Sequence, residues 1–272
     1  MGLTVMDERL DYPAAPSPDL KAHVLGVPVH LVGNYVQWLW QRVQQGKPAH
    51  VVTLNAEMAM QAERNSKLAD IIHGAELVVP DGAGVVLYLR LRNQRIQRCP
   101  GIELAESLIR QMGTPKQSSP RGDDVAPDVK SRPSLFLYGG APGITDIVAQ
   151  NWQAQLPHLA VAGTANGYIS AEEQDALCDR LKQEQPAVIL VGLGVPQQEF
   201  WIAHHRHLCP NSVWIGVGGS FDIWAGTKTR APGWLRNNNL EWSYRLYKEP
   251  WRWRRMLVLP QFAWRSLTTL WR

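Results

Sequence analysis

The sequence predicts an α/β protein with a Rossmann-like, mainly parallel sheet that carries helices on both faces, followed by a helical, basic C-terminal appendage. The first observation is that short β-branched runs alternate with amphipathic stretches, an order typical of right-handed βαβ crossovers. The second is a length of 272 residues with 45% hydrophobic content, which is enough for a sizeable core. The third is charge: residues 230–272 carry a net charge of +7, whereas the whole chain carries +4.

The chain begins with residues 1–20, whose Pro, Asp and Ser content predicts a flexible arm and whose charged start has no apolar core for a signal peptide. Residues 21–229 are expected to form one α/β domain. Its strands are predicted, in chain order, at 49–54, 76–80, 134–139, 159–163, 187–193 and 212–218, with a weaker candidate at 23–31.

The clearest helix lies in "SAEEQDALCDRLKQEQP", between the fourth and fifth of the six strands. Ser170 is the expected N-cap, Glu173 completes a capping box and Pro186 marks the end. In "GVPQQEFW" the same reasoning places Pro196 at the first position of a helix, where Glu199 is favourable near the positive end of the helix dipole.

Two segments depart from this alternation. Residues 113–133 are rich in Pro, Ser, Gly and charge and predict a mobile surface loop. Residues 230–272, the appendage, hold half of the chain's 12 tryptophans, and Pro250 is expected to split their helical pattern in two. On a helical wheel four cations of this segment share one face: Arg245, Lys248, Arg252 and Arg255.

The appendage and the cysteines together predict a cellular location. No stretch reaches 18 uncharged apolar residues, so no membrane span is expected. A basic, tryptophan-rich segment instead predicts a cytoplasmic protein that lies peripherally on the anionic inner face of the plasma membrane. Three scattered cysteines without metal-ligand spacing favour a reducing compartment. Self-association, which would cover the appendage, stays open.

Small and polar residues follow nearly every predicted strand, at the end where parallel α/β sheets bind ligands. The most informative stretch is "LVVPDGAGVV", in which a buried strand runs into a glycine-rich turn that opens with Asp81. On its own, Asp81 fits a helix N-cap as well as a catalytic base. Thr53 and Asn55, at the end of the first strand, also fit a turn.

The sequence gives little support for a dinucleotide site, a metal site or a nucleic-acid-binding surface. "DGAG" and "YGGAPG" both miss the GxGxxG pattern, so a dinucleotide-dependent oxidoreductase is only the alternative hypothesis. His204, His205 and His207 have no carboxylate or cysteine at ligand spacing, which favours a solvated helix face over a metal site. A nucleic-acid-binding module is a third hypothesis, and the polar strand ends of the acidic body argue against it.

The combination of motifs is more specific than any one of them. "TLNAEM", "VVPDGAGVV", "NGY", "VGLGVPQQEFWI", "GVGGSFDIWAG" and "RAPGWLRNNNLEWSYRLYKEPWRWRR" occur in this order, over roughly residues 24–258. Together they resemble the WecG/TagA/CpsF glycosyltransferases, glycosyltransferase family 26. The chain departs from the family at Gln197, where lysine is usual, and in the 113–133 insertion.

The resemblance implies an inverting hexosyltransferase for cell-surface polysaccharide or teichoic-acid-type synthesis. It would move an N-acetylhexosamine-type sugar, N-acetylmannosamine or its uronate, from a UDP-sugar to a polyprenyl-diphosphate-linked sugar, without a metal or other cofactor. Asp81 is the implied general base with Thr53 beside it, and arginines would neutralise the departing diphosphate. The candidate substrate-binding residues are Asn55, Arg98, Tyr168, Gln198, Glu199, Asp222, Arg230, Arg236, Arg245 and Arg252.

Overall fold

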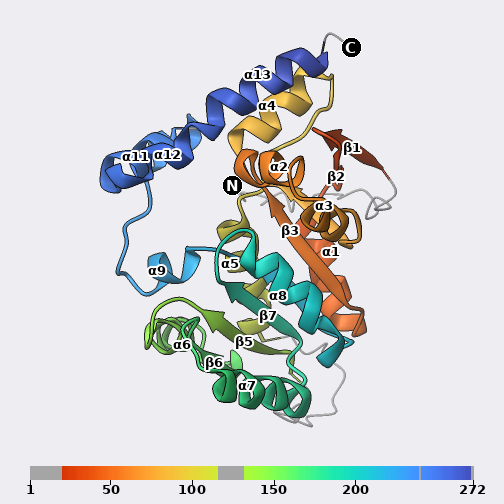
Figure 1. The fold of residues 1–272 in the computed structure, drawn as a ribbon. Helices are drawn as coiled ribbons and strands as arrows, with labels where there is room; N and C mark the ends of the chain where they lie inside the picture. The colour runs from red at the N-terminus through yellow and green to blue at the C-terminus, as the bar shows by residue number, and fades with distance from the viewer. Residues whose placement is uncertain (1–19, 116–131, 239, 271–272) are drawn as a thin grey trace, which may run out of the picture.

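The computed structural model describes residues 20–115, 132–238 and 240–270, and a six-stranded sheet lies at its centre (Figure 1). The strand order is β4-β3-β8-β7-β5-β6, and every neighbouring pair is parallel. The predicted fold class is therefore confirmed, with each strand close to its expected bounds. The strands are β3 (Ala49–Leu54), β4 (Leu77–Pro80), β5 (Ser134–Gly139), β6 (Ala160–Ala165), β7 (Val188–Gly192) and β8 (Val213–Gly216).

The weaker strand candidate at 23–31 is instead an antiparallel hairpin of two strands, β1 (Lys21–Val24) and β2 (Val27–His30), in a separate small sheet. The prediction of one strand is wrong because Leu25 and Gly26 both take positive φ angles, 49° and 89°, and turn the chain back. The hairpin is tied to the main sheet where the Val78 N–H donates to the His30 ring at 2.9 Å.

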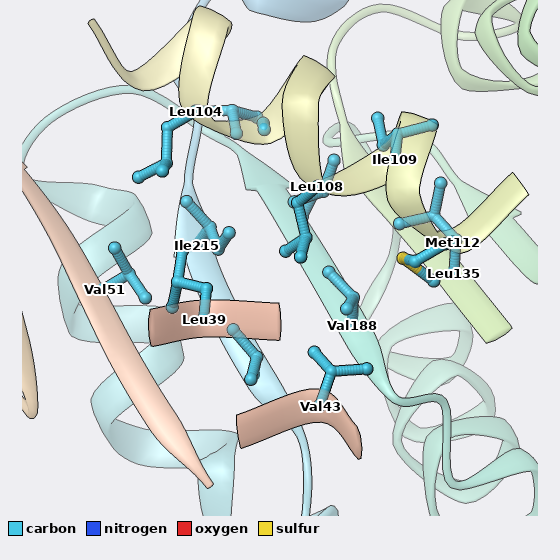
Figure 2. Packing of buried hydrophobic residues seen from close by; sticks show 14 of the residues in the cluster. Leu39, Val43, Val51, Leu104, Leu108, Ile109, Met112, Leu135, Val188 and Ile215 are labelled. Atoms are coloured by element: carbon cyan, nitrogen blue, oxygen red, sulfur yellow. The ribbon is translucent and has the colours of Figure 1, made fainter. Parts of the chain in front are cut away.

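Successive side chains of the parallel strands point to opposite faces of the sheet and pack into a hydrophobic core on each face. One face is covered by α1 (Tyr35–Gln45), α5 (Gly101–Gly113) and α6 (Ile144–Gln155). Figure 2 shows α1 and α5 side chains, such as Leu39 and Leu108, packing around Val188 and Ile215. The other face is covered by α2 (Ala56–Ala62), α3 (Ser66–His73), α4 (Ala83–Leu91), α7 (Ala171–Glu184) and α8 (Gln197–His205).

The helix signals of the sequence hold in two of three places. Ser170 and Glu173 form the predicted capping box of α7, which ends just before Pro186. Pro250 begins a short 3-10 turn after α11 and so divides the appendage as expected. Pro196 is the N-cap of α8 rather than its first residue, so the predicted start was one position early.

The appendage forms a chain of helices that leads away from the sheet and ends against α2 and α4. After α9 (Ser220–Trp224) come α10 (Gly233–Asn237), α11 (Glu241–Lys248), α12 (Trp253–Met256) and α13 (Val258–Leu270). In Figure 1, α13 runs alongside α4 and above α2. Phe262 is its buried anchor. The boundary at 229/230 stays a prediction, and the expected arm at 1–20 and loop at 113–133 fall mainly outside the described residues.

Candidate active site

A cavity of about 610 Å³ lies at the carboxyl ends of the central strands, between the sheet and the appendage. Its body wall includes Thr53 at the end of β3, Asp81 directly after β4 and the glycines that follow β8. Its opposite wall is made by α11 and the turn after it, including Tyr244, Arg245 and Trp251. The site is therefore a seam between two parts of the chain that are far apart in sequence.

Asp81 is fixed by the strand it leaves. Its N–H and that of Gly82 both donate to the Leu54 carbonyl, at 2.9 and 3.3 Å, which extends the contact between β3 and β4 by one step. The side chain keeps 26% of its surface exposed. Gly82 is the N-cap of α4 and no side chain caps that helix. The structure thus decides against the N-cap role and leaves the Asp81 carboxylate directed at the cavity.

The glycines beside Asp81 serve helix packing. A Cβ atom at Gly82 would lie 3.1 Å from the Asn55 Cβ, and one at Gly84 would lie 3.4 Å from the Phe262 ring. Gly101, at the start of α5, is tighter still, because its Cβ would be 2.7 Å from a Thr53 methyl carbon. These positions let the neighbouring segments close around Asp81.

The surroundings of Asp81 raise the pKa of its carboxyl to about 6. Burial is the largest cause, because it disfavours the charged form. The positive charges of Arg98 and Arg245 lower the pKa, the negative charge of Glu241 raises it, and a hydrogen bond from the Gly101 N–H lowers it. A carboxylate with this pKa is ionised at neutral pH and is still basic enough to take a proton.

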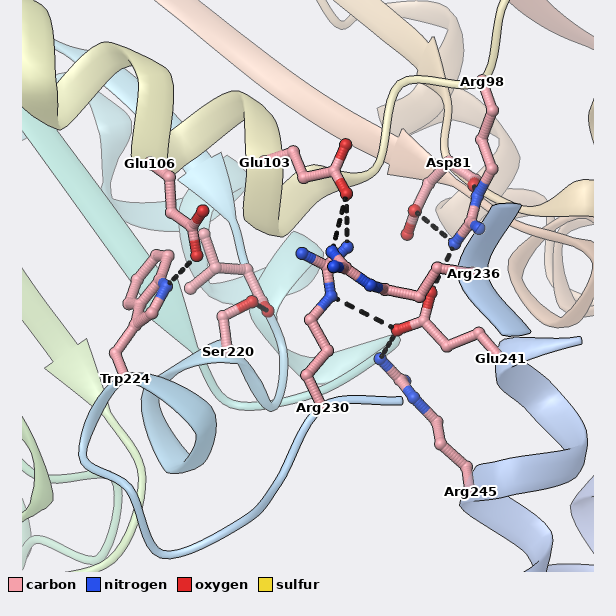
Figure 3. A network of polar contacts seen from close by, with 11 residues as sticks. Asp81, Arg98, Glu103, Glu106, Ser220, Trp224, Arg230, Arg236, Glu241 and Arg245 are labelled. Atoms are coloured by element: carbon pink, nitrogen blue, oxygen red, sulfur yellow. Dashed lines mark hydrogen bonds and ion pairs between the residues drawn. The ribbon is translucent and has the colours of Figure 1, made fainter. Parts of the chain in front are cut away.

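Arginines from three segments converge on Glu241 beside this carboxylate (Figure 3). Arg98 Nη2 lies 2.9 Å from Glu241 Oε2 and 4.0 Å from Asp81 Oδ1. Arg245 Nη2 and Arg230 Nε lie 3.3 and 3.7 Å from Glu241 Oε1. These contacts hold the pKa of Glu241 below its usual value although burial acts in the opposite direction. Glu241 is therefore a buried anion that joins the appendage to the body.

Three further predicted residues line the cavity and form hydrogen bonds to the backbone. Thr53 Oγ1 donates to the Gly216 carbonyl at 3.2 Å, and Asn55 Oδ1 accepts from the Met58 N–H at 3.0 Å as the N-cap of α2. Gln198 Oε1 accepts from the Gly218 N–H at 3.0 Å, which ties α8 to the loop after β8. All three side chains line the cavity, so the sequence placed them at the right end of the sheet.

Glu199 has a different position from the one expected of a substrate ligand. It is fully buried, accepts from Gln198 Nε2 at 2.9 Å and lies 2.8 Å from the His50 ring. It does not line the cavity. In this structure Glu199 supports Gln198 from behind the cavity wall, and its contact with substrate stays a prediction.

The remaining predicted ligands are more dispersed. Tyr168, after the edge strand β6, is 79% exposed and lies outside the cavity wall. Asp222 pairs with Lys228 at 2.8 Å. Arg230 and Arg236 lie next to the cavity, 2.6 and 3.6 Å from Glu103. The side chain of Arg252 falls outside the described part of the structure, so its predicted role is unaltered.

Sequence reasoning missed several cavity-lining charges: Glu57, Lys228, Glu241, Lys248, Glu249 and Arg255. Arg255 pairs with Glu57 at 2.7 Å, and Lys228 lies 3.1 Å from Glu249. The shared helical face of the appendage cations was a signal for Lys248 and Arg255. Nothing in the local sequence marks Lys228 or Glu241, because their positions depend on how α11 docks.

Within residues 20–115, 132–238 and 240–270, no three or more His, Cys, Asp or Glu side chains gather as metal ligands would, and metal independence stays a prediction. No helix in the same ranges has the length and apolar character needed to cross a bilayer.

Comparison with known proteins places the chain among glycosyl transferases. A family model described as "Glycosyl transferase WecG/TagA/CpsF family" matches residues 22–272. An N-acetylglucosaminyldiphosphoundecaprenol N-acetyl-beta-D-mannosaminyltransferase of Bacillus subtilis (strain 168) is 35% identical over 81% of this chain and 80% of its own length. A protein of the same name from Bacillus spizizenii is 34% identical over 81% of this chain and 79% of its own length.

Proposed function

The chain belongs to the WecG/TagA/CpsF family of glycosyl transferases, and from that premise we propose that it moves an N-acetylmannosamine-type sugar from a UDP-sugar to N-acetylglucosamine on undecaprenyl diphosphate. The names of the two Bacillus relatives support the transferred sugar and the acceptor. The family resemblance supports the UDP donor. The observation that carries the proposal is the Asp81 carboxylate in a cavity whose other wall is cationic.

In the proposed reaction, the Asp81 carboxylate accepts the proton of the acceptor hydroxyl while that oxygen bonds to the anomeric carbon of the donor. The bond between this carbon and the UDP oxygen breaks, and UDP leaves with the electron pair. Attack from the side opposite UDP inverts the anomeric centre. A carboxylate with a pKa of about 6 suits this step near neutral pH. It is mostly ionised there, and it binds a proton more strongly than a carboxylate with the usual pKa.

The negative charge that grows on UDP would be met by side chains of the cavity. Its cations are Arg98, Lys228, Arg245, Lys248 and Arg255. All except Lys248 pair with a carboxylate in the structure. Lys248 lies over the Tyr244 ring, 5.8 Å from its centre, and no ion pair to a carboxylate is found for it among the described residues. We therefore place Lys248 with Arg245 as the first diphosphate contacts.

The acceptor lipid suggests that the protein works at a membrane surface. Trp251, Trp253 and Trp264 of the appendage are 72%, 53% and 69% exposed, and tryptophan is favoured at the level of lipid headgroups. The net charge of this segment is also positive. We propose peripheral binding through this surface. Sedimentation with anionic liposomes tests it: a Trp253→Ser/Trp264→Ser variant should stay largely in the supernatant, and full binding by that variant would refute it.

The function itself is tested by incubating the protein with a panel of UDP-sugars and a short-chain N-acetylglucosaminyl-diphosphate lipid. We expect UDP release and a longer lipid-linked saccharide with UDP-N-acetylmannosamine, and much less with UDP-glucose. UDP, but neither NAD nor single-stranded DNA, should raise the melting temperature. If none of the UDP-sugars supports transfer and NAD raises the melting temperature, the oxidoreductase alternative is favoured.

Metal independence is a separate prediction. Because arginine and lysine side chains surround the cavity, the developing charge on UDP can be neutralised without a cation. Treatment with EDTA should leave the transfer rate close to its initial value. A complete loss that added Mg²⁺ or Mn²⁺ restores would show that the reaction uses a metal.

A further inference from the structure

Glu241 has no assigned part in the reaction, yet it shares an arginine, Arg98, with the proposed base. It is the first residue of α11, its side chain is 9% exposed, and it lines the cavity. Arg98, Arg230 and Arg245 surround it from the body and the appendage. A carboxylate held by so many cations is costly to remove, which is the usual property of a structural latch.

The placement of Arg98 suggests a second role. Arg98 Nε donates to the main-chain carbonyl of Asp81 at 2.6 Å, which keeps the guanidinium beside the Asp81 side chain. Its Nη2 atom has two carboxylates in reach and lies 2.9 Å from Glu241 but 4.0 Å from Asp81. Glu241 therefore draws the guanidinium toward itself. Arg245, whose charge also acts on Asp81, is held by Glu241 at 3.3 Å.

We propose that Glu241 is a positioning residue that keeps Arg98 and Arg245 from forming a close ion pair with Asp81, so that the Asp81 carboxylate stays free to accept the acceptor proton. The inference rests on the proposed function, since it gives Asp81 the role of base. A close Arg–Asp pair would stabilise the ionised form and weaken the base. Glu241 acts through the arginines and contacts no reacting atom in this account.

The other charged groups near Asp81 fit this arrangement. The Gly101 N–H stabilises the ionised form from α5. The Cys99 thiol, whose pKa burial and the Asp81 charge raise to about 12, stays neutral. The remaining charges of the cavity wall are Glu57, Lys228, Lys248, Glu249 and Arg255, of which Glu57 is paired with Arg255 and Lys228 with Glu249. Among the carboxylates of the described cavity wall, Glu241 is thus the one that shares an arginine with Asp81 and whose charge raises the Asp81 pKa.

The test is the pH dependence of kcat/KM for Glu241→Gln, because this ratio reports ionisation in the free enzyme. The amide keeps one oxygen for Arg98 but removes the negative charge. The acid limb should move to lower pH, so that the ratio of kcat/KM at pH 5 to that at pH 8 rises about threefold, the effect of a half-unit fall in a pKa near 6. At pH 8, kcat should fall more than the KM of the donor changes. Glu241→Asp should return the limb toward its original position.

A purely structural role for Glu241 predicts a different result. If Glu241 only holds the appendage, Glu241→Gln lowers the rate at every pH and leaves the acid limb unmoved, and that outcome overturns the proposal, as would a shift to higher pH. Glu249→Gln is the matched control: it alters the same helix and cavity, but Glu249 is not among the charges that act on Asp81. Its acid limb should match the wild type whatever its rate.

A second measurement does not depend on activity. The Asp81 carboxyl can be titrated by carbon-13 NMR, with Asp81→Asn identifying its resonance. Glu241→Gln should lower the Asp81 pKa strongly when Arg98 is present and much less in an Arg98→Gln background, where the guanidinium that lies 4.0 Å from Asp81 is gone and only Arg245 remains to move. The double variant also avoids a buried arginine without its partner. Equal shifts in both backgrounds would overturn the Arg98 route. If the wild type transfers no sugar, the proposed function fails, and this titration still decides the role of Glu241.

Discussion

The sheet body and the C-terminal appendage share one cavity but are held in place by different forces. Strands such as β3 and β7 are almost completely buried, and their side chains fill cores on both faces. In the described part of α10 to α13, Phe262 is the only large apolar side chain that is buried. Val258 and Leu259 pack beside it while partly exposed, and five ion pairs add connections to the body: Arg98–Glu241, Lys228–Glu249, Arg230–Glu103, Arg255–Glu57 and Arg265–Glu63.

This difference fits a division of work within the site. Hydrophobic burial gives the body a rigid frame, which fixes the proposed base within a hydrogen-bonded strand end. Partly exposed ion pairs contribute little stability each, about 0–1 kcal/mol, and their arginines can exchange a carboxylate for a phosphate. The appendage is therefore suited to an anionic substrate that must enter and leave.

The largest expected effect comes from the body. Asp81→Asn removes the proposed base with little change of shape, so transfer should fall by about 10²–10⁴-fold, the usual contribution of a general base. UDP binding, measured by calorimetry, should persist because the cations of the opposite wall remain. A variant that keeps most of its turnover would show that the base lies elsewhere.

A matched pair of core substitutions tests how each region is held. Leu190→Ala, at a fully buried position of β7, should lower the free energy of unfolding by about 2–5 kcal/mol. Phe262→Ala should instead release α13, with faster amide exchange there and little loss of protection in β7.

The distinction between body and appendage would be wrong if Phe262→Ala lowered amide-exchange protection throughout the sheet as much as Leu190→Ala does. The appendage would then be part of the same cooperative unit as the body.

A smaller effect concerns stability and has the opposite sign from most substitutions. Because folding raises the Asp81 pKa from 3.8 to about 6, its ionisation disfavours the folded state by an amount that grows from about pH 4 and is fully present above about pH 6. Asp81→Asn should therefore stabilise the protein at pH 8, by no more than about 3 kcal/mol. The gain should shrink as the pH falls through 6 and vanish below 4. Chemical denaturation at pH 8 and pH 4 measures it, and a loss of stability at pH 8 would contradict the cause given for the shift.

The body was largely predictable because its signals are local. Each strand is a short β-branched run between helical patterns, and parallel topology places every carboxyl end at one edge. Thr53, Asn55, Asp81 and Gln198 could therefore be assigned to the same edge of the sheet from the sequence, and all four line one cavity. The hairpin at 23–31 was missed because its turn depends on a positive φ at Leu25, which few side chains adopt.

The seam was harder to predict because it depends on docking. The burial of Glu199 follows from its contact with His50, a residue 149 positions away, whereas its local sequence indicates only a favourable helix start. Glu241 is also acidic within a basic segment, and its sequence does not show that Arg98 will lie against it. Pairs of this kind become visible only when the tertiary structure brings distant segments together.

The central claim is that a partly buried carboxylate, Asp81, is the base at the seam between body and appendage. The most direct measurement is kcat/KM for sugar transfer by the unmodified protein between pH 4.5 and 8. We expect a rise with pH that has its midpoint at about 6, since only the ionised form of Asp81 can accept the proton. A profile that stays flat down to pH 4.5 would contradict the account.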